Sequence, residues 1–225
     1  MSIFLNTEAI VLAKLPLKEA DRLYILFTPE FGKIEAQVKS AVTSKSKLAG
    51  SLEPISQAKI MIVKGRHLES VAGAQLLQRF NFSEPLIFGQ IGLVRELFIK
   101  LLKPEVKEPV LYQNLLSYLS AMSGSAELEA KRFLTQRFIW QLLNISGFSG
   151  ITDDTLYLHS AHGQNQDISG LDLPTRELLK NCLLLEPQPL QVADNLLQKL
   201  ENFTRTYLRQ ILERDLNSFY FNLSL

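Results

Sequence analysis

Residues 19–39 read EADRLYILFTPEFGKIEAQVK, and this stretch decides the fold of the first part of the chain. Every second residue is apolar from Leu23 to Phe27 and again from Ile34 to Val38. A period of two predicts β-strands. Pro29–Gly32 predicts the turn that joins them, in which Gly32 is free to adopt a positive φ. The stretch therefore predicts an antiparallel hairpin.

Strand signals continue on both sides of this hairpin. An apolar run at 9–13 precedes it, and apolar runs at 58–63 and 68–76 follow it. The last two flank Lys64–His67, which contains a glycine and is typical of a hairpin turn. About five short strands in about 80 residues suit a small barrel, and the OB-fold is the common five-stranded form.

The periodicity becomes helical after residue 80. Apolar residues recur at spacings of three and four, which predicts amphipathic helices. The predicted helices cover 86–102, 110–122, 126–145, 175–185 and 191–214. Between them, 146–174 is dense in Gly, Ser, Asp and His and predicts an irregular insert. We expect an α+β protein, with a five-stranded OB-fold barrel in 1–80 and an all-α helical domain in 81–225.

The composition is that of an ordinary globular protein. Of 225 residues, 46% are hydrophobic and 21% are charged, which argues against bulk disorder, collagen and coiled coils. The single cysteine, Cys182, excludes an intramolecular disulfide and any zinc site that needs two thiolates. No basic N-terminal segment with a cleavage site is present. We therefore expect a cytoplasmic protein.

One group of residues in the insert resembles a metal or acid–base site. His159 and His162 are three residues apart, close to Asp153 and Asp154. Their segment is rich in glycine and lacks a second ligand pair, which favours a solvated loop. A hydrolase that used either aspartate as an acid would lack a paired partner. We expect no metal, no cofactor and no catalytic residue.

Positive charge is concentrated in the predicted barrel. Residues 1–80 hold 11 Lys and Arg against 7 Asp and Glu, whereas 81–225 hold 13 against 16. A basic stretch on a small β-barrel is typical of nucleic-acid binding, although a solvated lysine face would give the same count. The segment 40–50 carries no acid and many small hydroxyl residues, which suits contacts to phosphates rather than to bases.

The basic residues of this region are the candidates for DNA phosphate contacts. The first choices are Lys39, Lys45 and Lys47, and the second choices are Arg22, Lys33, Lys64 and Arg66. Aromatic rings can stack on bases. Tyr24 is predicted to lie on the opposite face of its strand from the core residue Phe27, and is the first stacking candidate. Phe31, at the turn, is the second. With so few rings, phosphate contacts are expected to dominate.

Several segments, taken in their order along the chain, resemble one bacterial family. They are Glu19–Leu23, Leu26–Lys33, Lys39 with Ser44–Pro54, Lys64–Leu68 and, more weakly, Leu216–Phe219. Together they resemble the RecO family of DNA repair and recombination mediator proteins. The first two segments look like the family's first hairpin, the third like its basic loop and short helix, and the fourth like its next hairpin.

The resemblance implies an OB-fold followed by a helical domain, and a protein that is not an enzyme. It implies binding of single- and double-stranded DNA without sequence preference, annealing of complementary strands, and an association with the nucleoid. The implied partners are RecR and the C-terminal tail of single-stranded DNA-binding protein, with which RecA is loaded. Many members carry a four-cysteine zinc module, which this chain lacks, so no zinc role is carried over.

The residues alone leave a second interpretation open. The OB-fold could belong to an adaptor that binds RNA or protein, with the helical domain as the working surface. An acidic tail would need a pocket with an apolar floor and a basic residue. The helical candidates for that residue are Arg132, Arg137, Arg205 and Arg209.

Overall fold

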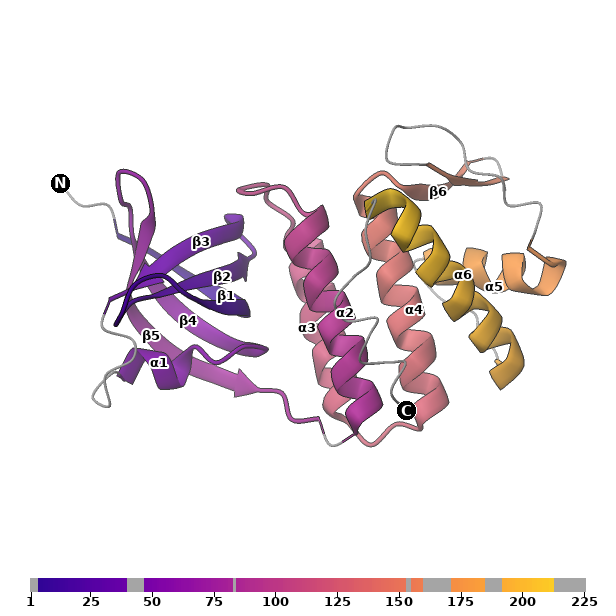
Figure 1. The fold of residues 1–225 in the computed structure, drawn as a ribbon, viewed down its shortest axis with the longest axis horizontal. Coiled ribbons are helices and arrows are strands. Elements are labelled where there is room, and N and C mark those ends of the chain that lie inside the picture. Colours follow the sequence, from indigo (N-terminus) through magenta and orange to yellow (C-terminus); the bar gives the residue numbers. More distant parts are fainter. Residues whose placement is uncertain are drawn as a thin grey trace. The chain divides into compact units, whose positions relative to one another are not determined.

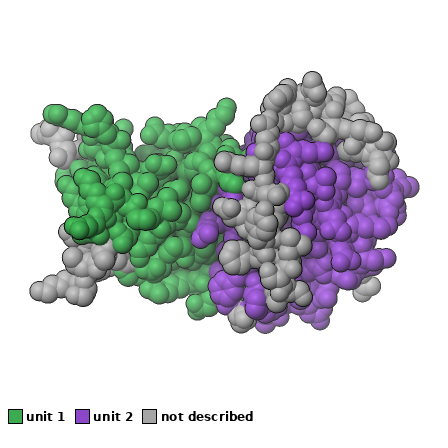
Figure 2. All heavy atoms as spheres, in the orientation of Figure 1, with its two compact units in different colours: residues 1–81, 97–123 green, residues 82–96, 124–225 purple. Residues whose placement is uncertain are grey.

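A computed structural model describes residues 4–39, 47–82, 84–152, 155–159, 171–184 and 192–212 (Figure 1). The chain forms two compact units (Figure 2). Unit 1 consists of residues 1–81 and 97–123, and unit 2 of residues 82–96 and 124–225. Among the described residues, no helix combines the length and the apolar composition needed to cross a membrane.

Unit 1 contains a closed five-stranded barrel, which confirms the predicted OB-fold. Its strands are β1 (Phe4–Pro16), β2 (Arg22–Thr28), β3 (Gly32–Val38), β4 (Ser56–Val63) and β5 (Glu69–Arg79). They pair in the order β1-β2-β3-β5-β4. The pairing of β3 with β5 is parallel and the other pairings are antiparallel. The short helix α1 (Lys47–Ser51) lies between β3 and β4 in sequence.

Strand β2 is buried on both faces, which corrects the prediction for Tyr24. Tyr24 and Leu26 belong to the barrel core, and both side chains are 0% exposed. Phe27 faces the other way and is also buried, because its ring packs against Phe98 and Tyr112 at centroid distances of 5.1 and 6.0 Å. The alternation correctly predicted the strand. It could not reveal that helical residues cover the strand's outer face.

The helical residues of unit 1 come from two helices. They are the end of α2 (Pro85–Leu101) and all of α3 (Pro109–Ser123). The compact units therefore divide the chain differently from the expected boundary after residue 80. The connection between these helices runs along the start of β3, where the backbone N–H of Glu105 donates to the carbonyl of Lys33 at 3.0 Å.

Gly32 permits this close approach. Its φ is +66°, and a Cβ atom there would lie 2.0 Å from the carbonyl oxygen of Val106. A left-handed φ is unfavourable for a residue that has a Cβ atom. The short distance to Val106 also leaves no room for a Cβ atom. The predicted turn glycine is thus also the position against which the helical connection packs.

Unit 2 is built on α4 (Leu128–Ile145), α5 (Leu173–Leu183) and α6 (Asp194–Leu212), together with residues 85–96 of α2. At its centre the Trp140 ring, 0% exposed, stacks on Tyr207 at 5.4 Å. Its indole N–H donates to the hydroxyl of Thr204 at 3.0 Å. The long amphipathic α6 is held by this aromatic stack and by its apolar face.

The insert at 146–174 is not wholly irregular. It contains a two-stranded sheet of β6 (Ser149–Thr152) and β7 (Thr155–Leu158). The Tyr207 hydroxyl anchors the sheet, because it lies 2.5 Å from the carbonyl oxygen of Phe148 and 2.8 Å from that of His159. These strands are only four residues long, too short for a period of two to be recognised in the sequence.

Cys182 lies in α5 with a side chain that is 0% exposed, as expected for a small apolar core residue. Burial raises the pKa of its thiol to about 12. His159 is half-buried, whereas His162, Asp153 and Asp154 lie outside the described residues. Within the described part of the chain, no three His, Cys, Asp or Glu side chains are grouped to hold a metal ion.

Candidate nucleic-acid interface

The predicted phosphate-binding residues lie at two ends of the barrel. On one end, Lys14 is opposite Tyr24 in the β1–β2 register, and Arg22 is opposite both Pro16 and Val38. Lys39 follows Val38 directly, so it belongs to the same end. We call this the α1 end of the barrel, because α1 follows β3 in the chain and the Arg79 guanidinium donates to the carbonyl of Gly50, in α1, at 2.7 Å.

The α1 end carries five described cations, which are Lys14, Lys18, Arg22, Lys39 and Arg79, together with the acids Glu19, Asp21 and Glu53. Lys39 and Arg79 are exposed, and Arg22 is half-buried. One nitrogen of Arg22, Nη1, donates to the carbonyls of Asp21 and Lys18 at 2.8 and 3.3 Å. These bonds fix the guanidinium and leave its other N–H groups for an incoming acceptor.

Lys33, Lys64 and Arg66 lie at the opposite end, near the β2–β3 and β4–β5 turns. Lys64 and Arg66 are exposed. Lys33 is held instead, since its ammonium donates to the carbonyl of Ile99, in the last turn of α2, at 2.6 Å. Burial lowers the pKa of Lys33. The seven predicted residues therefore do not form one continuous surface, and Lys33 caps a helix.

The structure does not describe the side chains of two first-choice residues, Lys45 and Lys47. Lys45 lies outside the described residues. For Lys47 the backbone is described, at the first position of α1, but the side chain is not. The start of α1 follows Lys39 within the same connection, so the backbone of Lys47 belongs to the α1 end.

The two predicted stacking residues have different surroundings. Tyr24 is 0% exposed, so its ring is not at the surface, where a base could stack on it. Phe31 is half-buried and packs against the barrel core at the turn end. It lines a cavity of about 170 Å³ whose charged residues are Glu30, Glu69, Glu105, Lys64 and Lys107. Three carboxylates against two ammonium groups make this cavity a poor place for a phosphate.

Lys14 was missed by the sequence reasoning. Its ammonium forms an ion pair with Glu53 at 3.0 Å, and the two side chains are 27% and 44% exposed. It follows the apolar run at 9–13, far in sequence from the basic stretch. Extending the strand predicted from that run by one residue would have placed Lys14 at a strand end. Only the β1–β2 register brings it beside Tyr24 and Arg22.

Unit 2 contains a second candidate site, a cavity of about 320 Å³ lined by α2, α4 and α6. Leu86, Leu93 and Leu208 supply apolar surface, and Arg132, Arg205 and Glu201 supply charge. Much of the remaining lining consists of side-chain amides and hydroxyls. Such a mixture suits a ligand with both apolar and polar groups.

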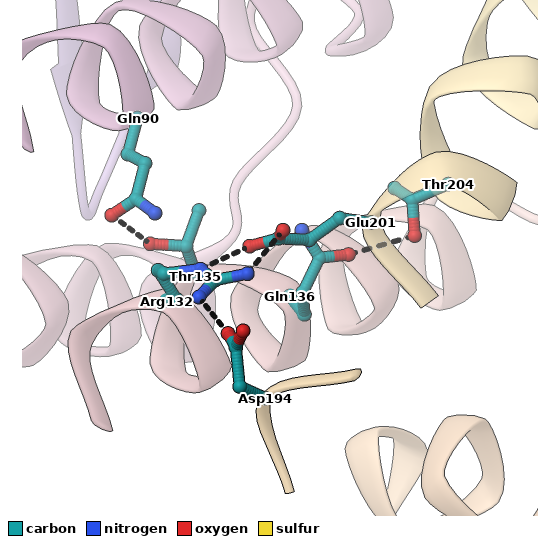
Figure 3. Close-up of polar contacts among 7 residues, drawn as sticks. All are labelled: Gln90, Arg132, Thr135, Gln136, Asp194, Glu201 and Thr204. Atoms are coloured by element: carbon teal, nitrogen blue, oxygen red, sulfur yellow. Dashed lines mark hydrogen bonds and ion pairs between the residues drawn. The ribbon is translucent and has the colours of Figure 1, made fainter. Parts of the chain in front are cut away.

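Arg132 is fully engaged at the edge of this cavity (Figure 3). Its Nε and Nη2 donate to the two carboxylate oxygens of Glu201 at 2.9 and 2.8 Å, and Nη1 pairs with Asp194. The bonds to Glu201 are the main reason why the pKa of Arg132 is raised. Beside this pair, Thr204 donates to Gln136 at 2.7 Å. The charge of Arg132 is thus balanced within unit 2.

Comparison with known proteins connects this geometry to one family. Residues 1–80 match the family model described as "Recombination protein O N terminal". The chain is similar to "DNA repair protein RecO" of Dehalococcoides mccartyi, with 33% identity over 64% of the chain and 56% of the relative. The protein of that name from Geobacter metallireducens is 32% identical over 64% of the chain and 58% of the relative.

A longer match extends beyond the barrel. "DNA repair protein RecO" of Roseiflexus is 28% identical over 242 aligned residues, which cover 96% of the chain and 84% of the relative. The other two matches cover little more than half of each relative's length. The similarity is therefore highest in identity over matches that cover about two thirds of the chain, and in one relative it extends over nearly all of it.

Proposed function

Because the chain belongs to the RecO family, we propose that it is a non-enzymatic DNA-binding mediator of recombinational repair. It binds single- and double-stranded DNA at the α1 end of its barrel, without preference for sequence. The observation that carries the proposal is the group formed by Lys14, Arg22, Lys39 and Arg79. The proposal also assigns phosphate contacts to Lys45 and Lys47, whose side chains lie outside the described part of the structure.

The chemistry of this surface favours phosphates over bases. Lysine and arginine neutralise backbone phosphates and release counterions, whichever bases are present. The buried ring of Tyr24 removes the main stacking candidate from the surface. A surface that screens two phosphate backbones also lowers the repulsion between complementary strands, which is how annealing follows from binding. DNA as the ligand implies a location at the nucleoid.

Partner binding belongs to unit 2 in this proposal. The partners are RecR and the acidic C-terminal tail of single-stranded DNA-binding protein, and RecA is loaded as a result. The cavity between α2, α4 and α6 offers the tail an apolar lining and Arg205, beside Arg132, which is paired with Glu201 and Asp194. The side chain of Asp194 is 66% exposed. A carboxylate of the tail can therefore replace it on Arg132 at little cost in desolvation.

Fluorescence anisotropy with labelled single-stranded DNA, double-stranded DNA and RNA of the same sequence tests the proposal. We expect both DNA forms to bind, with affinity falling as salt rises and changing little between sequences. Because the phosphate contacts leave no role for base identity, a scrambled oligonucleotide is the matched control. Binding of RNA alone, or binding that is insensitive to salt, would instead favour the adaptor interpretation.

A further inference from the structure

The hydroxyl of Tyr24 is an unsatisfied polar group inside the barrel. The residue is 0% exposed, and the partner that acts on its hydroxyl is the Lys14 ammonium, which can only donate, so among the described residues the hydroxyl proton has no acceptor. A buried donor without an acceptor is unfavourable and uncommon in a folded protein. The charges that act on it are those of Lys14, Glu53 and Arg22. The hydroxyl therefore lies close to the charged groups of the α1 end.

Lys14 and Glu53 form the ion pair beside this hydroxyl. Lys14 is directly opposite Tyr24 in the antiparallel register, and its ammonium is 3.0 Å from a carboxylate oxygen of Glu53. Arg22 lies two residues before Tyr24 on the same face of β2. An ammonium that is paired with Glu53, a guanidinium and a hydroxyl thus lie on one face of the paired strands β1 and β2.

We propose that Glu53 occupies a phosphate position, and that a DNA phosphate displaces it to bind Lys14, Arg22 and the Tyr24 hydroxyl. This inference rests on the proposed function, since it assigns a regulatory residue to the same DNA surface. A phosphate, like a carboxylate, is an anion with several acceptor oxygens, so it can take over the ion pair with Lys14. It can also accept from the hydroxyl that Glu53 leaves unsatisfied.

The exposures of the two partners suit such an exchange. Glu53 is 44% exposed, so its displaced carboxylate is readily hydrated. Lys14 is 27% exposed, so its ammonium is close enough to the surface for a DNA backbone to approach. An ion pair that is only partly buried contributes modest free energy, and a polyanion can therefore compete for it. Glu53 acts as a built-in competitor that weakens DNA binding.

A double-mutant cycle on the full chain tests this competition by anisotropy of a fluorescein-labelled oligothymidylate. Glu53→Gln is expected to raise the affinity about twofold to fivefold beyond its matched control. The control is Glu35→Gln, which removes the same charge from an exposed position of β3. In a Lys14→Gln background, Glu53→Gln should do no more than Glu35→Gln does. Lys14→Gln alone should lower the affinity and flatten the salt slope by about 0.7.

Two outcomes overturn the inference. Glu53→Gln and Glu35→Gln could raise the affinity equally, or the advantage of Glu53→Gln could persist without Lys14. If the unmodified chain still binds with a steep salt dependence, either outcome refutes the competition and leaves the proposed function standing. A chain that binds no DNA refutes both.

Tyr24→Phe provides a second readout that a purely structural role would not move. The substitution keeps the buried ring and removes only the unsatisfied hydroxyl. We expect the melting temperature to stay the same or rise, because the loss removes a buried donor without a partner. The affinity for the oligothymidylate should nevertheless fall. An affinity equal to that of the unmodified chain would exclude the hydroxyl from the phosphate site.

Discussion

The two ends of the barrel allow the proposed DNA surface to be tested with matched charge changes. The first variant combines Arg22→Gln with Lys39→Gln at the α1 end. The second combines Lys64→Gln with Arg66→Gln at the turn end. Each removes two positive charges from unit 1, and none of the four side chains takes part in a described ion pair. The variants therefore differ in where the charge is lost rather than in how much.

The expected loss at the α1 end follows from counterion release. Each phosphate contact to a single strand contributes about 0.7 to the slope of log affinity against log salt. Two lost contacts should flatten the slope by about 1.4, which corresponds to about 25-fold in affinity near 0.1 M salt. The turn-end variant should change the slope by less than half as much, because Glu30, Glu69 and Glu105 surround that end.

Fluorescence anisotropy across a salt series measures both slopes with the same oligonucleotide. Circular dichroism melts serve as the folding control, and both variants should melt near the unmodified chain because their substitutions lie at or near the surface. Equal slopes for the two variants would mean that net charge alone drives binding. A larger loss at the turn end would place the DNA surface there and refute the assignment to the α1 end.

Three further predictions concern packing and capping. Gly32→Ala should lower the free energy of unfolding by about 2 to 4 kcal/mol in urea denaturation, since it combines a φ of +66° with a backbone clash; an unchanged midpoint would contradict the close packing. A fragment of residues 1–80 lacks the rings that cover Phe27, so it should bind a hydrophobic dye more strongly than the full chain; equal dye binding would show that the barrel does not need residues 97–123. Asp172→Asn should lower the melting temperature at pH 7, because bonds from Lys199 and from the α5 cap hold the pKa of this carboxyl near 2, below its ordinary 3.8. That stabilisation is present above pH 3.8 and is lost as the pH falls through about 2, so the two melting curves should converge there; a constant difference down to that pH would exclude the ionised carboxylate as its source.

The segments that resembled the RecO family in the sequence lie mostly in the region that the family model matches. The hairpin around Gly32 and the basic segments that follow it are local features, so they can be read without knowing what they pack against. The matching family model covers this same region, residues 1–80. The helical half was predicted only as a pattern, and it contributes the weaker part of the resemblance.

The sequence by itself indicated, from the spacing of its apolar residues, which segments form the barrel strands and which form the major helices. Five strands and the major helices were predicted from alternation and from helical spacing, because those patterns depend on one side of an element being buried. Tyr24 and Phe27 mark the limit of this reasoning, since both faces of β2 are buried and the pattern cannot say by what. The β6 and β7 strands were missed because four residues are too few to show a period of two, and Tyr207, which anchors them, lies far away in sequence.

Tertiary structure decided which charges act together. The candidate basic residues all fall within residues 22–66, but the antiparallel strands carry them to opposite ends of the barrel. The same register brings Lys14 and Arg22 to one end, where Glu53 pairs with the lysine. Local pattern reports which residues share a face of one strand, whereas charge chemistry depends on distances between strands. Only the closed barrel fixes those distances.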